Sequence, residues 1–87
     1  MDQFEQAKKR YEDLLPSMTA IKTKEFRKDL ARFSCNCVDT LTEISKESVV
    51  CRQRRQVTEK YKNLIKSYIE SVDNLEKYIM LAHLSGG

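Results

Sequence analysis

Apolar residues recur every three or four positions along most of this chain, which is the spacing of one face of an α-helix. The first stripe consists of Phe4, Ala7, Tyr11, Leu14, Met18 and Ile21. Pro16 interrupts it, because proline inside a helix removes a backbone hydrogen bond and its ring clashes with the carbonyl four residues earlier. The pattern therefore predicts a first helix over about residues 3–15, followed by a connector.

A second stripe, shifted in phase by one residue from the first, predicts a second helix. Its members are Phe26, Leu30, Phe33, Cys37, Leu41 and Ile44. Thr23 is a suitable N-cap, and Glu25 is a favourable acidic residue in the first turn. The polar stretch SKES, residues 45–48, is the best turn candidate, so the second helix is expected over about residues 24–45.

The third stripe is the longest and the widest. It consists of Val57, Tyr61, Leu64, Tyr68, Val72, Leu75, Ile79 and Ala82. Ile65 and Ile69 widen it beyond the narrow seam of a two-stranded coiled coil. It predicts a third helix over about residues 49–84, roughly 54 Å long at 1.5 Å per residue. Residues 85–87 form a tail in which Gly86 ends the helix.

The stripes also predict how the helices pack. A turn near residues 47–48 folds the third helix back along the second, and the first helix then covers the far end of the third. The expected cross-helix pairs are Ile44–Cys51, Phe33–Tyr61, Leu30–Leu64 and Phe26–Tyr68. The width of the third stripe leaves two possibilities open. Either the first helix folds over it, or a second copy packs there in a four-helix or larger bundle.

The sequence thus indicates an all-α fold: an antiparallel helical hairpin or three-helix bundle with a long C-terminal helix, formed by a single domain over residues 1–87. Composition agrees, because two glycines and one proline leave little material for the turns of a β-fold. A chain of this length buries only roughly 60–65% of its unfolded surface. Support from a protein partner or from homo-oligomerisation is therefore expected.

No segment has the character of a signal peptide or of a membrane span. Residues 1–12 carry six charged side chains. The apolar run YIML, followed by AHL, is far shorter than the ~20 residues that a membrane span needs. Three cysteines, an odd number, favour reduced thiols. We expect a soluble chain in an intracellular compartment, cytoplasmic or nuclear.

Metal binding and catalysis have little to build on in this sequence. Cys35 and Cys37 lie two residues apart, so on a helix they point about 200° from each other and cannot chelate one ion. The single histidine, His83, lies at the opposite end of the expected hairpin from Cys51. No Gly-rich phosphate loop and no nucleophile with a base beside it is present. We expect no enzyme activity, no metal site, no cofactor and no small-molecule substrate.

Positive charge is concentrated in one segment, although the net charge is only +3. Between positions 52 and 66 the sequence has six basic residues and only one acidic residue, Glu59. The basic residues are Arg52, Arg54, Arg55, Lys60, Lys62 and Lys66. On a continuous helix, most of them share a face turned away from the apolar stripe. Such a face suits an anionic partner. The first interpretation of this face is a plain solvated face or an intersubunit salt-bridge face. If it binds an anionic partner, we expect an acidic protein surface, with nucleic acid as the second candidate and an anionic membrane surface ranked last.

The segment CRQRR, residues 51–55, resembles the Cys-Arg-x-Arg-Arg stretch of basic-region leucine-zipper proteins, whose continuous helix crosses the DNA major groove. The resemblance covers five residues. That family has an Asn seven residues before the cysteine and two alanines shortly before it, where this chain has Ile44, Glu47 and Ser48. The zipper's leucine positions fall on Lys62, Ile69, Glu76 and His83. No DNA-reading role is therefore carried over to these arginines.

We therefore expect a non-enzymatic helical protein–protein interaction module: an adapter, a regulator or a self-assembling subunit. Partner or self-association contacts are expected at Phe26, Leu30, Phe33, Tyr61, Leu64, Tyr68, Leu75 and Ile79. The pattern leaves open whether these side chains form the internal core or an interface. The alternative is a small nucleic-acid-associated regulator that uses the basic residues between Arg52 and Lys66.

Overall fold

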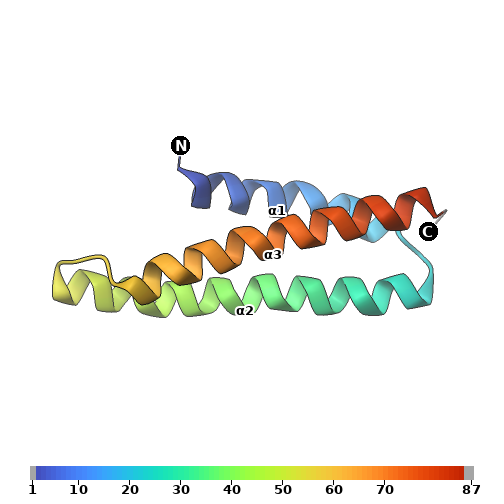
Figure 1. Ribbon diagram of the computed structural model, residues 1–87. Coiled ribbons are helices and arrows are strands. Elements are labelled where there is room, and N and C mark those ends of the chain that lie inside the picture. The colour runs from blue at the N-terminus through green and yellow to red at the C-terminus, as the bar shows by residue number, and fades with distance from the viewer. Residues whose placement is uncertain (1, 86–87) are drawn as a thin grey trace.

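The computed structural model describes residues 2–85, and within that range the chain is three α-helices with no strand (Figure 1). Helix α1 is Gln3–Ala20, α2 is Lys24–Arg54 and α3 is Glu59–Leu84. The all-α, three-helix prediction is confirmed. The predicted ending at Gly86 lies outside the described residues.

Helix α1 begins at Asp2, whose carboxylate accepts a hydrogen bond from the Glu5 backbone N–H at 2.8 Å. It does not end near residue 15 as predicted, because it continues through Pro16 to Ala20. The turn that follows the proline brings Met18 against the core and leads into Ile21, which is only 1% exposed. The free energy gained by burying Met18 and Ile21 offsets the cost of the backbone hydrogen bond that the proline removes.

Helix α2 begins after Thr23, as predicted, but it does not stop at residues 45–48. The hydroxyl of Ser45 donates to the Leu41 carbonyl at 3.1 Å, so this serine bonds back into its own helix and does not cap another. Glu47 is 8% exposed and faces α3. The predicted turn at residues 45–48 was wrong, because these residues continue α2 and Glu47 packs toward α3. With 31 residues, α2 is longer than the C-terminal helix, which has 26.

The chain turns instead at residues 55–58, without a glycine or proline. Arg55 ends α2 in the left-handed conformation, with φ 55° and ψ 36°. Thr58 then caps α3, because its hydroxyl oxygen accepts from the Tyr61 backbone N–H at 3.1 Å. Helix α3 therefore begins at Glu59, and its predicted start near residue 49 was wrong.

The displaced turn changes which residues of α2 and α3 face each other. Phe33 and Phe26 both pack against Tyr78, with ring centroids 5.1 Å and 6.1 Å away. The predicted partners, Tyr61 and Tyr68, were wrong because the turn lies about eight residues further along the chain than expected. The amphipathic stripes were right, whereas the register between them depended on the turn.

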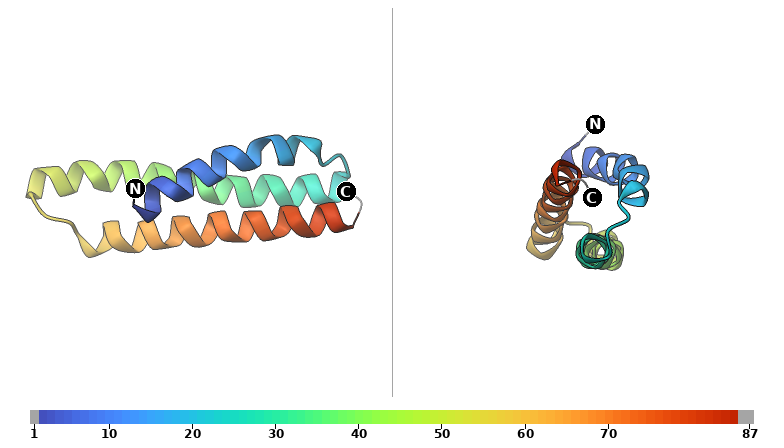
Figure 2. Two further views of the ribbon diagram at one scale, coloured as in Figure 1. Left: turned by 90° about the horizontal axis from the view of Figure 1, so that it is seen from above. Right: turned by 90° about the vertical axis from the view of Figure 1, so that its right-hand side faces the viewer.

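Helices α2 and α3 form an antiparallel hairpin, and α1 lies along the C-terminal part of α3 and parallel to it (Figures 1 and 2). The Phe4 ring packs edge-on against Tyr68 at 5.6 Å, and Arg10 pairs with Asp73 at 2.6 Å. The tip of the hairpin, around the turn at residues 55–58, projects beyond the N-terminus of α1 (Figure 1). The molecule is therefore elongated, with extents of 49 × 24 × 16 Å.

The three helices enclose one hydrophobic core. Its buried members are Ala7, Ile21, Leu30, Cys37, Ile44, Tyr68, Val72, Leu75, Ile79 and Ala82. Five of these lie on α3, and α1 and α2 cover them from two sides. Most of the wide third stripe is thus covered within the single chain, as in the first of the two arrangements that the sequence left open, but Val57 at its start is 58% exposed.

Candidate functional site

A groove runs between α1 and α2. Both helices pack extensively on α3, but they meet each other at few positions (Figure 2, right). A 2.6 Å hydrogen bond between the hydroxyls of Tyr11 and Ser34 bridges the two helices. On either side of this bridge the surface is hollowed, and the two hollows together form the candidate site.

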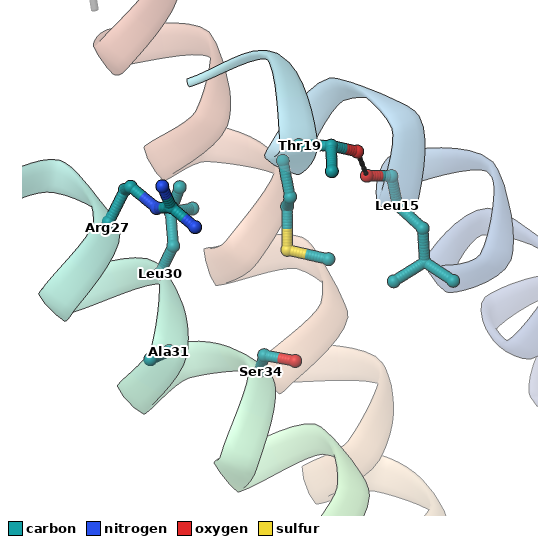
Figure 3. A pocket seen from close by; sticks show the side chains of 7 residues that line it. Leu15, Thr19, Arg27, Leu30, Ala31 and Ser34 are labelled. Carbon is teal, nitrogen blue, oxygen red and sulfur yellow. Dashed lines mark hydrogen bonds between the residues drawn. The ribbon is translucent and has the colours of Figure 1, made fainter. Parts of the chain in front are cut away.

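The first hollow has a volume of about 400 Å³ and lies near the C-terminal end of α1 (Figure 3). Its lining residues are Leu15, Met18, Thr19, Arg27, Leu30, Ala31 and Ser34. Leu15 and Thr19 come from α1, and Arg27 stands across from them on α2 (Figure 3). Leu30 is 4% exposed at its base, whereas Leu15 is 45% exposed on its wall. The hollow is thus largely apolar, with one cation at its edge.

The second hollow, about 390 Å³, lies near the N-terminal end of α1. Its lining residues are Phe4, Lys8, Leu41, Ile44, Ser45, Ser48, Arg52 and Tyr61. The Lys8 ammonium lies 4.7 Å from the centroid of the Phe4 ring and 2.9 Å from the Glu5 carboxylate. This hollow combines apolar side chains with small hydroxyls and two cations.

No aspartate or glutamate lines either hollow. The guanidinium groups of Arg27 and Arg52 form no ion pair with any residue between positions 2 and 85, whereas Lys8 shares its charge with Glu5. Arg27 and Arg52 lie 25 residues apart on the same helix, or roughly 37 Å at 1.5 Å per residue. The groove therefore carries an unpaired positive charge at each end.

The six basic residues predicted to bind an anion do not lie on one helical face. Arg52 and Arg54 are in the last turn of α2, Arg55 ends that helix, and the three lysines lie on α3. All six are exposed. Lys60 lies 4.0 Å from the Glu47 carboxylate and Lys62 lies 3.4 Å from Glu59. The chain reversal at residues 55–58 thus gathers most of this charge at the hairpin end.

The hairpin end has a hollow of its own, about 350 Å³. Its lining residues are Ser48, Cys51, Arg52, Arg55, Gln56, Val57 and Tyr61. Val57 is 58% exposed, and Val49 nearby in the sequence is 45% exposed. Sequence reasoning placed these residues within one helix and its preceding turn, so it could not foresee this surface.

The apolar residues predicted to contact a partner divide into two groups. Leu30, Tyr68, Leu75 and Ile79 are at most 4% exposed and form the chain's own core. Phe26, Phe33, Tyr61 and Leu64 are half-buried against that core. Sequence reasoning missed the exposed Leu15 and Val38 because neither belongs to an apolar stripe. For Leu15, the signal is an apolar residue beside a stripe, and the structure places it in the hollow between α1 and α2.

Two core groups have raised pKa values. Burial raises the pKa of the Cys37 thiol to about 11, and burial also raises the pKa of Tyr68 to about 12. Cys35 is exposed, whereas Cys37, which belongs to the second apolar stripe, is buried. Within residues 2–85, no three His, Cys, Asp or Glu side chains are grouped so that they could hold a metal ion. Because burial raises its pKa, the Cys37 thiol is protonated at neutral pH.

None of the helices in the described part of the chain combines the length and apolar character needed to cross a membrane. The chain matches no protein-family model, no curated protein and no solved structure. The groove and the hairpin end are therefore the two surfaces from which a function can be inferred.

Proposed function

We propose that this chain is a non-enzymatic helical protein–protein interaction module that receives a partner helix in the groove between α1 and α2. The observation that carries this proposal is the open groove itself. Because α1 packs on α3 and leaves α2 largely uncovered on that side, apolar side chains of both α1 and α2 line it. A fourth helix laid there completes a four-helix bundle, and an amphipathic helix in a groove is a common mode of recognition.

The spacing of the lining residues on α2 supports a helical partner. From one end of the groove to the other they are Arg27, Leu30, Ala31, Ser34, Leu41, Ile44, Ser45, Ser48 and Arg52. They recur mostly at intervals of three, four or seven, which defines a straight stripe along the helix. Alanine and serine in this stripe allow the backbone of a neighbouring helix to approach closely.

The test is chemical-shift mapping with a peptide of about 25 residues, which matches the groove in length. The peptide carries leucine at helical a and d positions and glutamine at the flanking positions, so it has no charge in the recognition segment. We expect shift changes concentrated at Leu15, Ala31 and Ser34. No change, or changes spread evenly over α3, would contradict the proposal. The Leu15→Gln variant removes apolar wall without touching the core and should weaken binding.

Oligomeric state decides between a partner protein and a second copy. Since the core of α3 is already covered by α1 and α2, we propose a partner from another protein and expect sedimentation equilibrium to give the monomer mass. A dimer that Leu15→Gln dissociates would instead identify a second copy as the fourth helix. The chain would then be a self-assembling subunit.

A second candidate function is nucleic-acid association through the hairpin end, which is favoured by the exposure of all six basic side chains there and on the adjoining turns of α3. Its signature is binding to duplex DNA that weakens steeply with salt, by a slope of about 0.9 per phosphate contacted. The Arg54→Gln and Arg55→Gln changes should each reduce that slope. Absence of binding at low salt would remove this candidate.

A further inference from the structure

We infer that the helix bound in the groove is acidic, with carboxylates that meet Arg27 at one end and Arg52 at the other. This inference rests on the proposed function, and it specifies the chemistry of the partner. It starts from charge complementarity. Cations but no carboxylates line both hollows, and neither guanidinium has an ion-pair partner in the described part of the chain.

The positions of the two arginines set the length of the partner helix. They lie 25 residues apart on α2, so a helix lying along the groove needs about 25 residues to reach both. An arginine binds a carboxylate through two parallel hydrogen bonds, which fixes orientation as well as charge. Between its acidic ends, the partner presents apolar side chains to Leu15, Leu30 and Leu41.

A second copy of this chain does not supply such a helix. Its α2 and α3 have the required length, but they bury their apolar stripes in their own core. Its α1 has only 18 residues and packs on α3. A basic partner is disfavoured as well, because it brings like charges to both ends of the groove. The occupant that fits is therefore an acidic amphipathic helix of another protein.

Three peptides of about 25 residues test this inference. They share the same leucines and differ only at the flanking positions, which are glutamate, glutamine or lysine. Fluorescence anisotropy at low salt should rank their affinities in the order glutamate, glutamine, lysine. We expect a difference of about tenfold or more between the first and the last, narrowing as salt is added.

Charge reversal identifies the residues responsible. Arg27→Glu and Arg52→Glu should each weaken the glutamate peptide by about three- to tenfold, since each change replaces an attraction with a repulsion. The double variant should prefer the lysine peptide. The control is Lys28→Glu, which makes the same change of charge one residue from Arg27 but lines neither hollow. It should change the affinity by less than about twofold.

The outcomes separate the inference from the proposed function. If the glutamine peptide binds in the groove and the glutamate peptide binds no tighter, the partner is not acidic, but the module remains a helix receptor. If Arg27→Glu and Arg52→Glu act no more strongly than Lys28→Glu, the inference is also overturned. If none of the three peptides binds, both the inference and the proposed function fail. Dimerisation through the groove would overturn the inference by placing a second copy there.

Discussion

At the scale of single residues, Glu47 joins the two helices of the hairpin. Its carboxylate is buried, and it accepts a hydrogen bond from the Thr58 hydroxyl at 2.6 Å. The same hydroxyl oxygen accepts from the backbone N–H of Tyr61 in the first turn of α3. One side chain of α2 therefore holds the N-cap of α3 in place. A buried carboxylate that lost this donor would be costly.

We predict that Glu47→Ala lowers the free energy of unfolding by about 1.5–3 kcal/mol, as expected for loss of a hydrogen bond to a charged group. Thr58→Ala should lower it by about 2–4 kcal/mol, because it removes both the cap and the hydrogen-bond donor of the buried Glu47 carboxylate. The double variant should lose clearly less than the sum, because the two side chains form one unit. Urea denaturation followed by circular dichroism measures all three. Additive losses would show that the two side chains act independently.

The cysteines provide a second prediction at this scale. Burial raises the pKa of Cys37 from its usual 9.0 to about 11, so the folded chain keeps this proton to a higher pH than the unfolded chain does. The stability that results is fully present below pH 9 and is lost as the pH rises toward 11. Cys37→Ala should flatten the fall in unfolding free energy over that range, and Cys35→Ala is the control for removing an exposed thiol. An unchanged slope in Cys37→Ala would contradict this.

At the scale of the helices, the apolar stripes predicted the three elements, but three of their ends were wrong. The stripe continues across Pro16, and the packed turn beyond it outweighed a strong local signal for a stop. The serines at 45–48 read as a turn, yet they lie within α2. The real stop depends on Arg55 in a conformation that glycine usually takes, and nothing local in the sequence marks it.

Arg55 therefore offers a test of helix termination. A residue with a Cβ pays about 1–2 kcal/mol in the left-handed conformation, and glycine loses about 0.5–1 kcal/mol of chain entropy. Arg55→Gly should thus raise the free energy of unfolding by about 0.5–1 kcal/mol. Arg54→Gly, one residue earlier and still helical, should lower it by a similar amount. Thermal denaturation compares the pair, and equal effects would contradict the assigned turn.

At the scale of the whole molecule, the chain has a three-helix body and a two-helix end. The tip of the hairpin, around the turn at residues 55–58, projects beyond the N-terminus of α1, so α2 and α3 mainly support each other there (Figure 1). The body holds the most deeply buried residues, Val72, Leu75 and Ala82. Cooperative opening should therefore begin at the hairpin end.

Hydrogen exchange under native conditions measures this difference. Backbone amides of residues 49–54 should exchange faster than those of residues 30–44, although both segments belong to the continuous helix α2. The segment expected to be protected contains the buried residues Leu30, Cys37 and Ile44. Equal protection along α2 would mean that the two-helix end is as stable as the body.

The two candidate surfaces differ in how far the sequence could reveal them. The six basic residues lie close together in the sequence, so the sequence alone identifies all of them. Their distribution over the end of α2 and the start of α3 could not be predicted, because it depends on the position of the turn. The groove exists because α1 packs on α3 and meets α2 at few positions, and the apolar stripes do not predict that arrangement. Leu15 and Arg27 come together only through this packing. A sequence shows which residues are neighbours along the chain. Which residues of two helices lie side by side depends on the register in which the helices pack.

The four tyrosines give this chain a set of internal reporters. They lie at Tyr11 between α1 and α2, at Tyr68 between α1 and α3, at Tyr78 between α2 and α3, and at Tyr61 at the hairpin end. Since the sequence contains no tryptophan, their ring signals are not masked by a stronger fluorophore. Each contact between two helices, and the hairpin end, thus contains its own tyrosine. The order in which these contacts separate during unfolding can therefore be followed without attaching a dye.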